Sequence, residues 1–229
     1  MKTLSIAAVQ RTAAIFRRFD YSALAAIYCN EGGEAFWRAM REPCRKLGLK
    51  VAACLRTHLR RGGRSLYVGA GVAEIPALVM ECLDLSRDVR AFNLRRKEVS
   101  LLRRACGTLS VDFQAADAGR ASGRFDHLWM VSVLNDPEEF PELSRLSYGQ
   151  ADPSQFRPKA FTTERKAVRR LADRCLRRLS LPALVTTSVE ETVWIEEWCD
   201  RRKIACLIEK KAYATALVGD PICFVRLGN

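Results

Sequence analysis

The spacing of apolar residues along the chain changes after its first quarter. Before that point apolar residues recur at intervals of three or four, as at Leu47, Val51 and Leu55. This spacing is typical of a helix with one buried face. Pro43 is expected to end an earlier helix, because its ring clashes with the preceding turn. We therefore predict a helical region over residues 1–61 that packs on the core of the protein.

Short β-type runs then alternate with helical segments. The predicted strands cover residues 65–68, 88–93, 110–115, 126–134, 183–189, 204–210 and 222–227. Strands that alternate with helices form a mainly parallel sheet with helices on both faces. No helix separates the last two strands, which indicates that the last one runs antiparallel. The predicted fold class is α/β, a three-layer sandwich around a mostly parallel seven-stranded sheet with an antiparallel last strand and extra N-terminal helices.

One polar segment interrupts this alternation. Residues 135–163 contain four prolines and no convincing helical or strand periodicity. A segment of this length is too long for an ordinary connection. We therefore interpret it as an insertion within one domain that spans residues 62–229.

Composition is consistent with one domain and limits the chemistry. The chain has 229 residues, of which 48% are apolar, and this is enough for one sizeable core. Its nine cysteines include no C-x-x-C pair and it has two histidines, so we expect neither a disulfide framework nor a metal site. No apolar run reaches the ~20 residues that a membrane span needs, and the N-terminus lacks a secretory signal pattern. These features predict a metal-free cytoplasmic protein.

A glycine-rich turn lies between the first predicted strand and the helix that follows it, in residues 65–73, Ser-Leu-Tyr-Val-Gly-Ala-Gly-Val-Ala. Gly69 and Gly71 lack a Cβ atom, so the backbone can turn tightly there and approach a ligand closely. The segment resembles the first motif of the class I S-adenosylmethionine-dependent methyltransferases. Tyr67 stands where that family usually has an acidic residue, and Ala73 stands where it has a third glycine.

The resemblance implies a binding site for S-adenosylmethionine at the ends of the first three strands. Asn93 occupies the place of the family's acid that binds the ribose hydroxyls, and it can also serve as a helix cap. Asp117 matches the acid that binds the adenine amino group, with an ordinary turn residue as the alternative. The residues that the resemblance places at the cofactor are Tyr67, Gly69, Ala70, Gly71, Asn93, Leu94, Asp117, Ala118 and Val131.

The end of the fourth predicted strand offers candidates for the acceptor side of the reaction. Asn135, Asp136 and Pro137 loosely resemble the N/D-P-P-aromatic motif of amino-group methyltransferases, and they are also a common turn sequence. By this resemblance Asn135 binds the substrate and Asp136 acts as the general base. Tyr28 and Trp37 in the N-terminal region are candidates for a lid over the substrate, with simple packing on the domain as the alternative.

The charge of the chain indicates a second kind of partner. The net charge is +12, and the predicted helix over residues 164–179 carries a run of basic residues off its apolar face. Such a run is usually a solvated surface, and it can also bind the phosphates of a nucleic acid. The candidates for that contact are Arg165, Arg169, Arg170 and Arg177.

Taken together, the motifs predict an enzyme that transfers the methyl group of S-adenosylmethionine to a nitrogen or oxygen of a small molecule. An aminocarboxypropyl transferase that uses the same cofactor is a second interpretation. A non-catalytic protein with a methyltransferase-like fold, which binds RNA or protein through its basic face, is a third. The sequence carries no signal for an oligomeric state.

Overall fold

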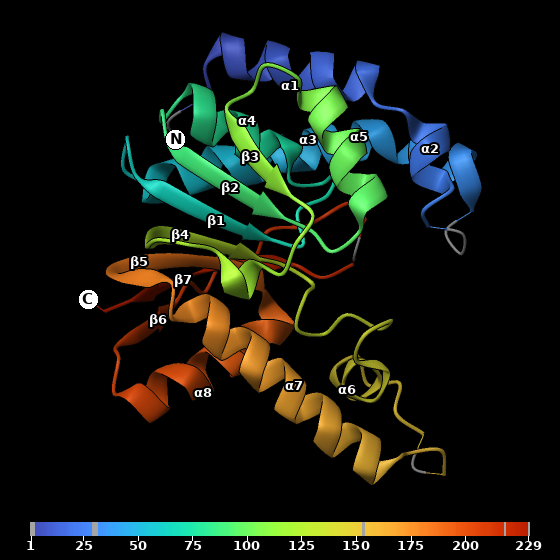
Figure 1. Ribbon diagram of the computed structural model, residues 1–229, viewed down its shortest axis with the longest axis vertical. Helices are drawn as coiled ribbons and strands as arrows, with labels where there is room; N and C mark the ends of the chain where they lie inside the picture. The colour runs from blue at the N-terminus through green and yellow to red at the C-terminus, as the bar shows by residue number, and fades with distance from the viewer. Residues whose placement is uncertain (1–2, 29–31, 153, 218, 229) are drawn as a thin grey trace. The chain divides into compact units, whose positions relative to one another are not determined.

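The computed structural model describes residues 3–28, 32–152, 154–217 and 219–228. The chain forms two compact units, Met1–Ala118 with Tyr213–Gly219, and Gly119–Ala212 with Asp220–Asn229. The strand order is β3-β2-β1 in the first unit and β4-β5-β7-β6 in the second (Figure 1). β7 runs antiparallel to both β5 and β6, whereas β1–β2, β2–β3 and β4–β5 are parallel pairs. The predicted fold class, a mostly parallel seven-stranded sheet with an antiparallel last strand, is confirmed.

The first unit begins with helices and continues as alternating strands and helices. Its elements are α1 (Ile6–Arg18), α2 (Tyr21–Ala25), α3 (Gly33–His58), β1 (Arg64–Val68), α4 (Ile75–Leu83), β2 (Asp88–Phe92), α5 (Arg96–Cys106) and β3 (Val111–Gln114). α1 and α3 both pack against α4. The predicted N-terminal helices are therefore present, while the domain boundary near residue 61 stays a prediction.

Pro43 does not end a helix, and this part of the prediction was wrong. α3 runs without a break from Gly33 to His58, with Pro43 inside it. Proline removes one backbone donor from a helix, but buried contacts on both sides, at Trp37 and Val51, hold the helix against its neighbours. Packing of a long amphipathic face outweighs the local cost of one missing hydrogen bond.

The carboxyl ends of β1, β2 and β3 lie level with one another. The parallel register pairs Val68 with Phe92, and Phe92 with Gln114. One residue further on, the Asn93 N–H still donates to the Gln114 carbonyl at 3.1 Å. In open α/β sheets ligands bind at this end of the strands, and the three loops that follow these strands begin at this edge.

The second unit contains the remaining strands and two long helices. Its elements are β4 (Phe125–Met130), α6 (Pro141–Ser147), α7 (Pro158–Leu176), β5 (Leu179–Ser188), η2 (Val189–Glu191), α8 (Thr192–Arg202), β6 (Cys206–Ile208) and β7 (Ile222–Leu227). The short helix η1 (Ala118–Arg120) lies at the junction of the two units. α6 lies inside the predicted insertion, and α7 starts six residues earlier than the sequence indicated, at Pro158, a residue favoured in the first turn of a helix.

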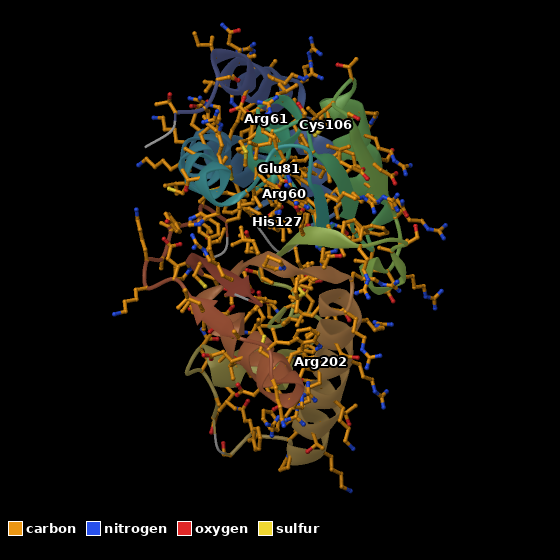
Figure 2. All side chains as sticks on the ribbon, turned by 90° about the vertical axis from the view of Figure 1, so that its left-hand side faces the viewer. Arg60, Arg61, Glu81, Cys106, His127 and Arg202 are labelled. Atoms are coloured by element: carbon orange, nitrogen blue, oxygen red, sulfur yellow. The ribbon has the colours of Figure 1, made fainter. Side chains whose placement is uncertain are left out.

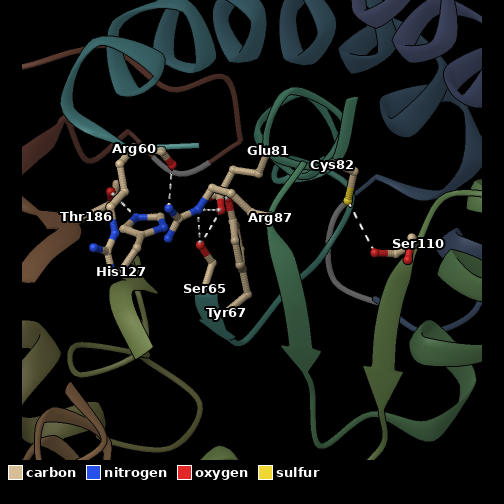
Figure 3. A network of polar contacts seen from close by, with 9 residues as sticks. All are labelled: Arg60, Ser65, Tyr67, Glu81, Cys82, Arg87, Ser110, His127 and Thr186. Atoms are coloured by element: carbon tan, nitrogen blue, oxygen red, sulfur yellow. Dashed lines mark hydrogen bonds and ion pairs between the residues drawn. The ribbon is translucent and has the colours of Figure 1, made fainter. Parts of the chain in front are cut away.

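Each unit buries polar side chains as well as apolar ones. Glu81 of α4 is fully buried in the first unit, and His127 of β4 is fully buried in the second (Figure 2). The His127 ring lies 2.9 Å from the Thr186 hydroxyl on the neighbouring strand β5 (Figure 3). In the described part of the chain, no helix is long and apolar enough to cross a membrane.

Candidate functional site

The glycine-rich turn after β1 places its two glycines differently. Gly69 has a φ of 72°, a conformation that L side chains rarely adopt. The Gly71 N–H donates to the Glu74 carboxylate at 2.8 Å. A Cβ atom on Gly71 would lie 2.9 Å from Oε1 of Glu98, which is closer than real carbon and oxygen atoms approach. The turn is thus shaped by backbone conformation at Gly69 and by a carboxylate at Gly71.

Glu98 is the charged group of this site that the sequence analysis missed. It lies in the first turn of α5 and is 2% exposed. Its Oε2 accepts hydrogen bonds from the Tyr28 hydroxyl at 2.7 Å and from the Asn93 amide at 3.0 Å. Burial raises the pKa of the Glu98 carboxyl above its usual value. Acids are common at the start of any helix, so the sequence offers no local reason to single this one out.

Asn93 holds the loops of the site together. Its amide nitrogen donates to the Ala70 carbonyl at 3.0 Å as well as to Glu98. Its amide oxygen accepts from the Arg95 N–H at 2.8 Å. The side chain therefore links the glycine-rich turn to the start of α5. Its predicted contact with the cofactor is untested and stays a prediction.

Aromatic side chains cover Glu98 from the N-terminal helical region. The Tyr28 ring lies 5.3 Å from the Trp37 ring, centroid to centroid, and the Arg95 guanidinium lies 4.5 Å above the Tyr28 ring. Burial and the adjacent Glu98 carboxylate raise the pKa of Tyr28 far above its usual value. Tyr28, predicted at the substrate, thus meets Asn93, predicted at the cofactor, through one shared carboxylate. Trp37 is 4% exposed, and within the described residues its indole nitrogen has no hydrogen-bond partner.

The Tyr67 side chain points into the interior of the first unit. It is fully buried, and its hydroxyl donates to Glu81 at 2.7 Å. Glu81 also pairs with Arg87 at 3.0 Å, and both of these side chains are fully buried (Figure 3). This network ties β1 to α4 on either side of the glycine-rich turn. Any contact of Tyr67 with a ligand is therefore left to its backbone.

The other residues predicted at the cofactor in this unit differ in exposure. Asp117 is partly exposed and directly precedes the short helix η1, whose first residue, Ala118, is buried. Asp117 follows the end of β3 at the same edge as Gly69 and Asn93. Leu94 is 70% exposed. We keep all three as predicted cofactor residues.

In the second unit, one buried carboxylate organises the loop after β4. Glu191 is fully buried and accepts hydrogen bonds from four consecutive backbone N–H groups, those of Ser132 at 3.1 Å, Val133 at 2.6 Å, Leu134, and Asn135 at 3.3 Å. Burial raises the pKa of Glu191. The sequence analysis did not select Glu191, because an acid before a helix has an ordinary local explanation.

The predicted acceptor residues lie on the loop that Glu191 holds. Asn135 is 1% exposed, and its amide oxygen accepts from the Trp194 indole at 3.3 Å. In the described part of the chain its amide nitrogen has no hydrogen-bond partner. Asp136 is partly exposed and accepts from the Glu138 N–H at 2.8 Å, as in a common turn. Val131, predicted at the cofactor, is partly exposed immediately after β4.

Comparison with solved structures identifies the fold. A magnesium protoporphyrin IX methyltransferase from Synechocystis PCC 6803, solved with bound SAM, aligns over 91% of this chain and 97% of its own chain, with a TM-score of 0.53 and 11% sequence identity. A methyltransferase from Pyrococcus furiosus aligns over 80% of this chain and 83% of its own chain, with a TM-score of 0.51 and 14% identity. This is the class I methyltransferase fold. A scan against protein-family models and a search of curated proteins gave no match. At these identities the class I methyltransferase likeness is one of fold.

Proposed function

We propose that this chain binds S-adenosylmethionine at the carboxyl ends of β1, β2 and β3 and transfers its methyl group to a nitrogen or oxygen of a small molecule. The observation that carries the proposal is the alignment of three strand ends, which puts the Gly69–Gly71 turn beside Asn93 and its partner Glu98. The class I methyltransferase fold is consistent with a ligand at this edge.

The residues at this edge fit a nucleoside cofactor. At Gly71 a Cβ would fill the space next to Glu98. One oxygen of Glu98 is engaged by Tyr28 and Asn93, and within the described residues the other, Oε1, accepts no hydrogen bond. A carboxylate beside a glycine backbone suits a ligand that presents hydroxyl groups. We therefore assign Glu98, Asp117 and the turn Gly69–Gly71 to the cofactor.

The cofactor, when bound, supplies an activated methyl group on a sulfonium. The protein then has to bring an acceptor atom into line with that methyl group and exclude water. We assign acceptor binding to Asn135, whose buried amide nitrogen can donate a hydrogen bond. We assign removal of the acceptor proton to Asp136, whose carboxylate is partly exposed.

Binding of S-adenosylmethionine and S-adenosylhomocysteine, measured by isothermal titration, tests the proposal. Gly71→Leu should abolish binding, because its side chain occupies the space beside Glu98, and Asp117→Ala should weaken it. Asp112→Ala is the matched control, since Asp112 is an exposed acid on β3, the strand that Asp117 follows. Wild-type protein that binds neither ligand at millimolar concentration refutes the proposal.

The transferred group is identified with cofactor labelled separately on its methyl carbon and on its carboxyl carbon. A methyltransferase moves only the first label to the acceptor. Transfer of the second label instead would replace the proposed reaction by aminocarboxypropyl transfer at the same site.

A further inference from the structure

The exposed side of α7 carries a line of basic residues. The buried side of this helix is formed by Val168, Ala172, Cys175 and Leu176. On the opposite side lie five exposed basic residues, which we call the α7 basic stripe: Lys159, Lys166, Arg170, Arg174 and Arg177. At about 100° per residue they fall within an arc of about 80°, and at 1.5 Å per residue they extend over roughly 27 Å. The stripe is thus a straight row of positive charge.

Of the acidic residues of α7 that the structure describes, only Asp173 pairs with a member of this row. The Glu164 carboxylate caps α6, where it accepts hydrogen bonds from the N–H groups of Glu142 at 2.9 Å and Leu143 at 3.0 Å. Asp173 pairs with Arg177 at 2.9 Å and with Arg202 of α8 at 2.7 Å (Figure 2 labels Arg202). Within the described residues, Lys166 and Arg170 make no ion pair. Lys166 and Arg170 therefore keep their full charge.

The four arginines singled out from the sequence do not form one surface. Arg169 is engaged in an ion pair with Glu197 of α8 at 2.8 Å. Arg165 is exposed, but it lies roughly 100° or more around the helix from Lys166 and Arg170. Arg170 and Arg177 belong to the stripe, and Lys159, Lys166 and Arg174 complete it. The sequence alone could not tell the stripe residues from the other arginines, because it does not show that Arg169 forms an ion pair with Glu197.

An aromatic pair lies near the N-terminal end of α7, on the side away from the stripe, because Phe161 falls roughly 160° around the helix from Lys159. The Phe156 and Phe161 rings lie 5.4 Å apart, centroid to centroid, and Phe156 is 37% exposed. A row of positive charges is the feature that binds the phosphates of a nucleic acid backbone. A helix that binds a membrane surface needs exposed large apolar residues beside its basic ones. Among the described residues, none of the exposed large apolar side chains belongs to α7.

We propose that the α7 basic stripe binds the phosphate backbone of a nucleic acid. This contact is independent of the proposed methyl transfer, because it uses no residue assigned to the cofactor or to the acceptor. It is a surface that the chain can use whether or not the nucleic acid is itself modified.

The experiment measures fluorescence anisotropy of an unstructured oligouridine of about 20 nucleotides at several salt concentrations. The test variant combines Lys166→Gln, Arg170→Gln and Arg174→Gln. The matched control combines Arg18→Gln, Lys50→Gln and Arg104→Gln, which are exposed basic residues outside α7. Both variants lose the same charge, so net charge alone affects them equally. Circular dichroism and the midpoint of thermal unfolding check that both remain folded.

We expect the stripe variant to bind at least roughly tenfold more weakly than the control, and its slope of log K against log salt to be smaller by about 2, since each lost phosphate contact on a single strand removes about 0.7. The proposal is overturned if wild-type protein does not bind the oligonucleotide, if both triple variants lose affinity equally, or if phosphatidylserine vesicles or polyglutamate bind the wild type more tightly than RNA does.

Discussion

Glu191→Gln should loosen the loop that carries Asn135 and Asp136. The carboxylate of Glu191 accepts only, and it does so from the backbone N–H groups of residues 132–135, from that of Ser188 at 3.4 Å and from the Thr187 hydroxyl at 3.0 Å. Glutamine has nearly the same shape, but one of its two ends is an NH2 group that can only donate. The substitution therefore changes hydrogen bonding at an almost constant volume.

The size of the effect follows from the arrangement of the donors. If the new NH2 group takes the place of Oε1, it faces the N–H groups of Val133, Leu134 and Asn135. If it takes the place of Oε2, it faces those of Ser132 and Ser188, while the Thr187 hydroxyl can turn round and accept. The first placement leaves three N–H groups without this acceptor. The second leaves only that of Ser188, because the Ser132 N–H also donates to the Ser188 hydroxyl at 2.9 Å. Each lost acceptor costs about 1–3 kcal/mol and part of this is recovered because a buried charge is removed, so we expect a net loss of about 1–2 kcal/mol.

Two measurements check this prediction. Urea unfolding gives the loss of stability, and amide hydrogen exchange shows where it arises, since residues 132–135 should exchange faster than in the wild type. Glu196→Gln is the control, because Glu196 is an exposed acid on the helix that follows Glu191. The reasoning is refuted if Glu191→Gln stays within about 0.5 kcal/mol of this control and the four amides keep their wild-type exchange rates.

Three further predictions concern the first unit. Glu81→Gln leaves the buried Arg87 guanidinium without its opposite charge, so urea unfolding should show a loss of about 3–5 kcal/mol; an unchanged midpoint would contradict it. Burial raises the pKa of Glu98, so the folded protein loses stability as the pH rises above the usual carboxyl value of 4.5. Glu98→Gln should therefore make the stability depend less on pH above that value. If wild type and variant show the same dependence of stability on pH, the titration of Glu98 is not its cause. Gly48→Ala should lower the unfolding temperature, because a Cβ there would lie 2.6 Å from the Pro76 ring; the clash, at about 1–3 kcal/mol, outweighs a gain of up to about 1 kcal/mol in helix propensity. A rise in the unfolding temperature would contradict this and would show that α3 and α4 can shift to accommodate the added methyl group.

Local patterns along the sequence are enough to predict the class of this fold. Apolar spacing gives the identity of most helices and strands, and the order in which they alternate gives a mostly parallel sheet with an antiparallel last strand. The glycine-rich turn could be recognised as well, because the conformation of Gly69 depends on that residue and its immediate neighbours. The same local reasoning failed at Pro43, where a long packed face carries the helix through a residue that would end a shorter one.

The charged groups that shape the candidate site were decided by the tertiary structure. Glu98 meets Tyr28 across a separation of 70 residues, and Glu191 meets the loop after β4 across 56 to 59 residues. Both acids stand at the start of a helix, where an acid already has a favourable local interaction, so nothing in the sequence marks Glu191 as different from its neighbour Glu190. The difference lies in burial, which removes water from the carboxylate and makes backbone and side-chain donors its only partners. Burial depends on which distant segments pack together, and that information is absent from any short stretch of the chain.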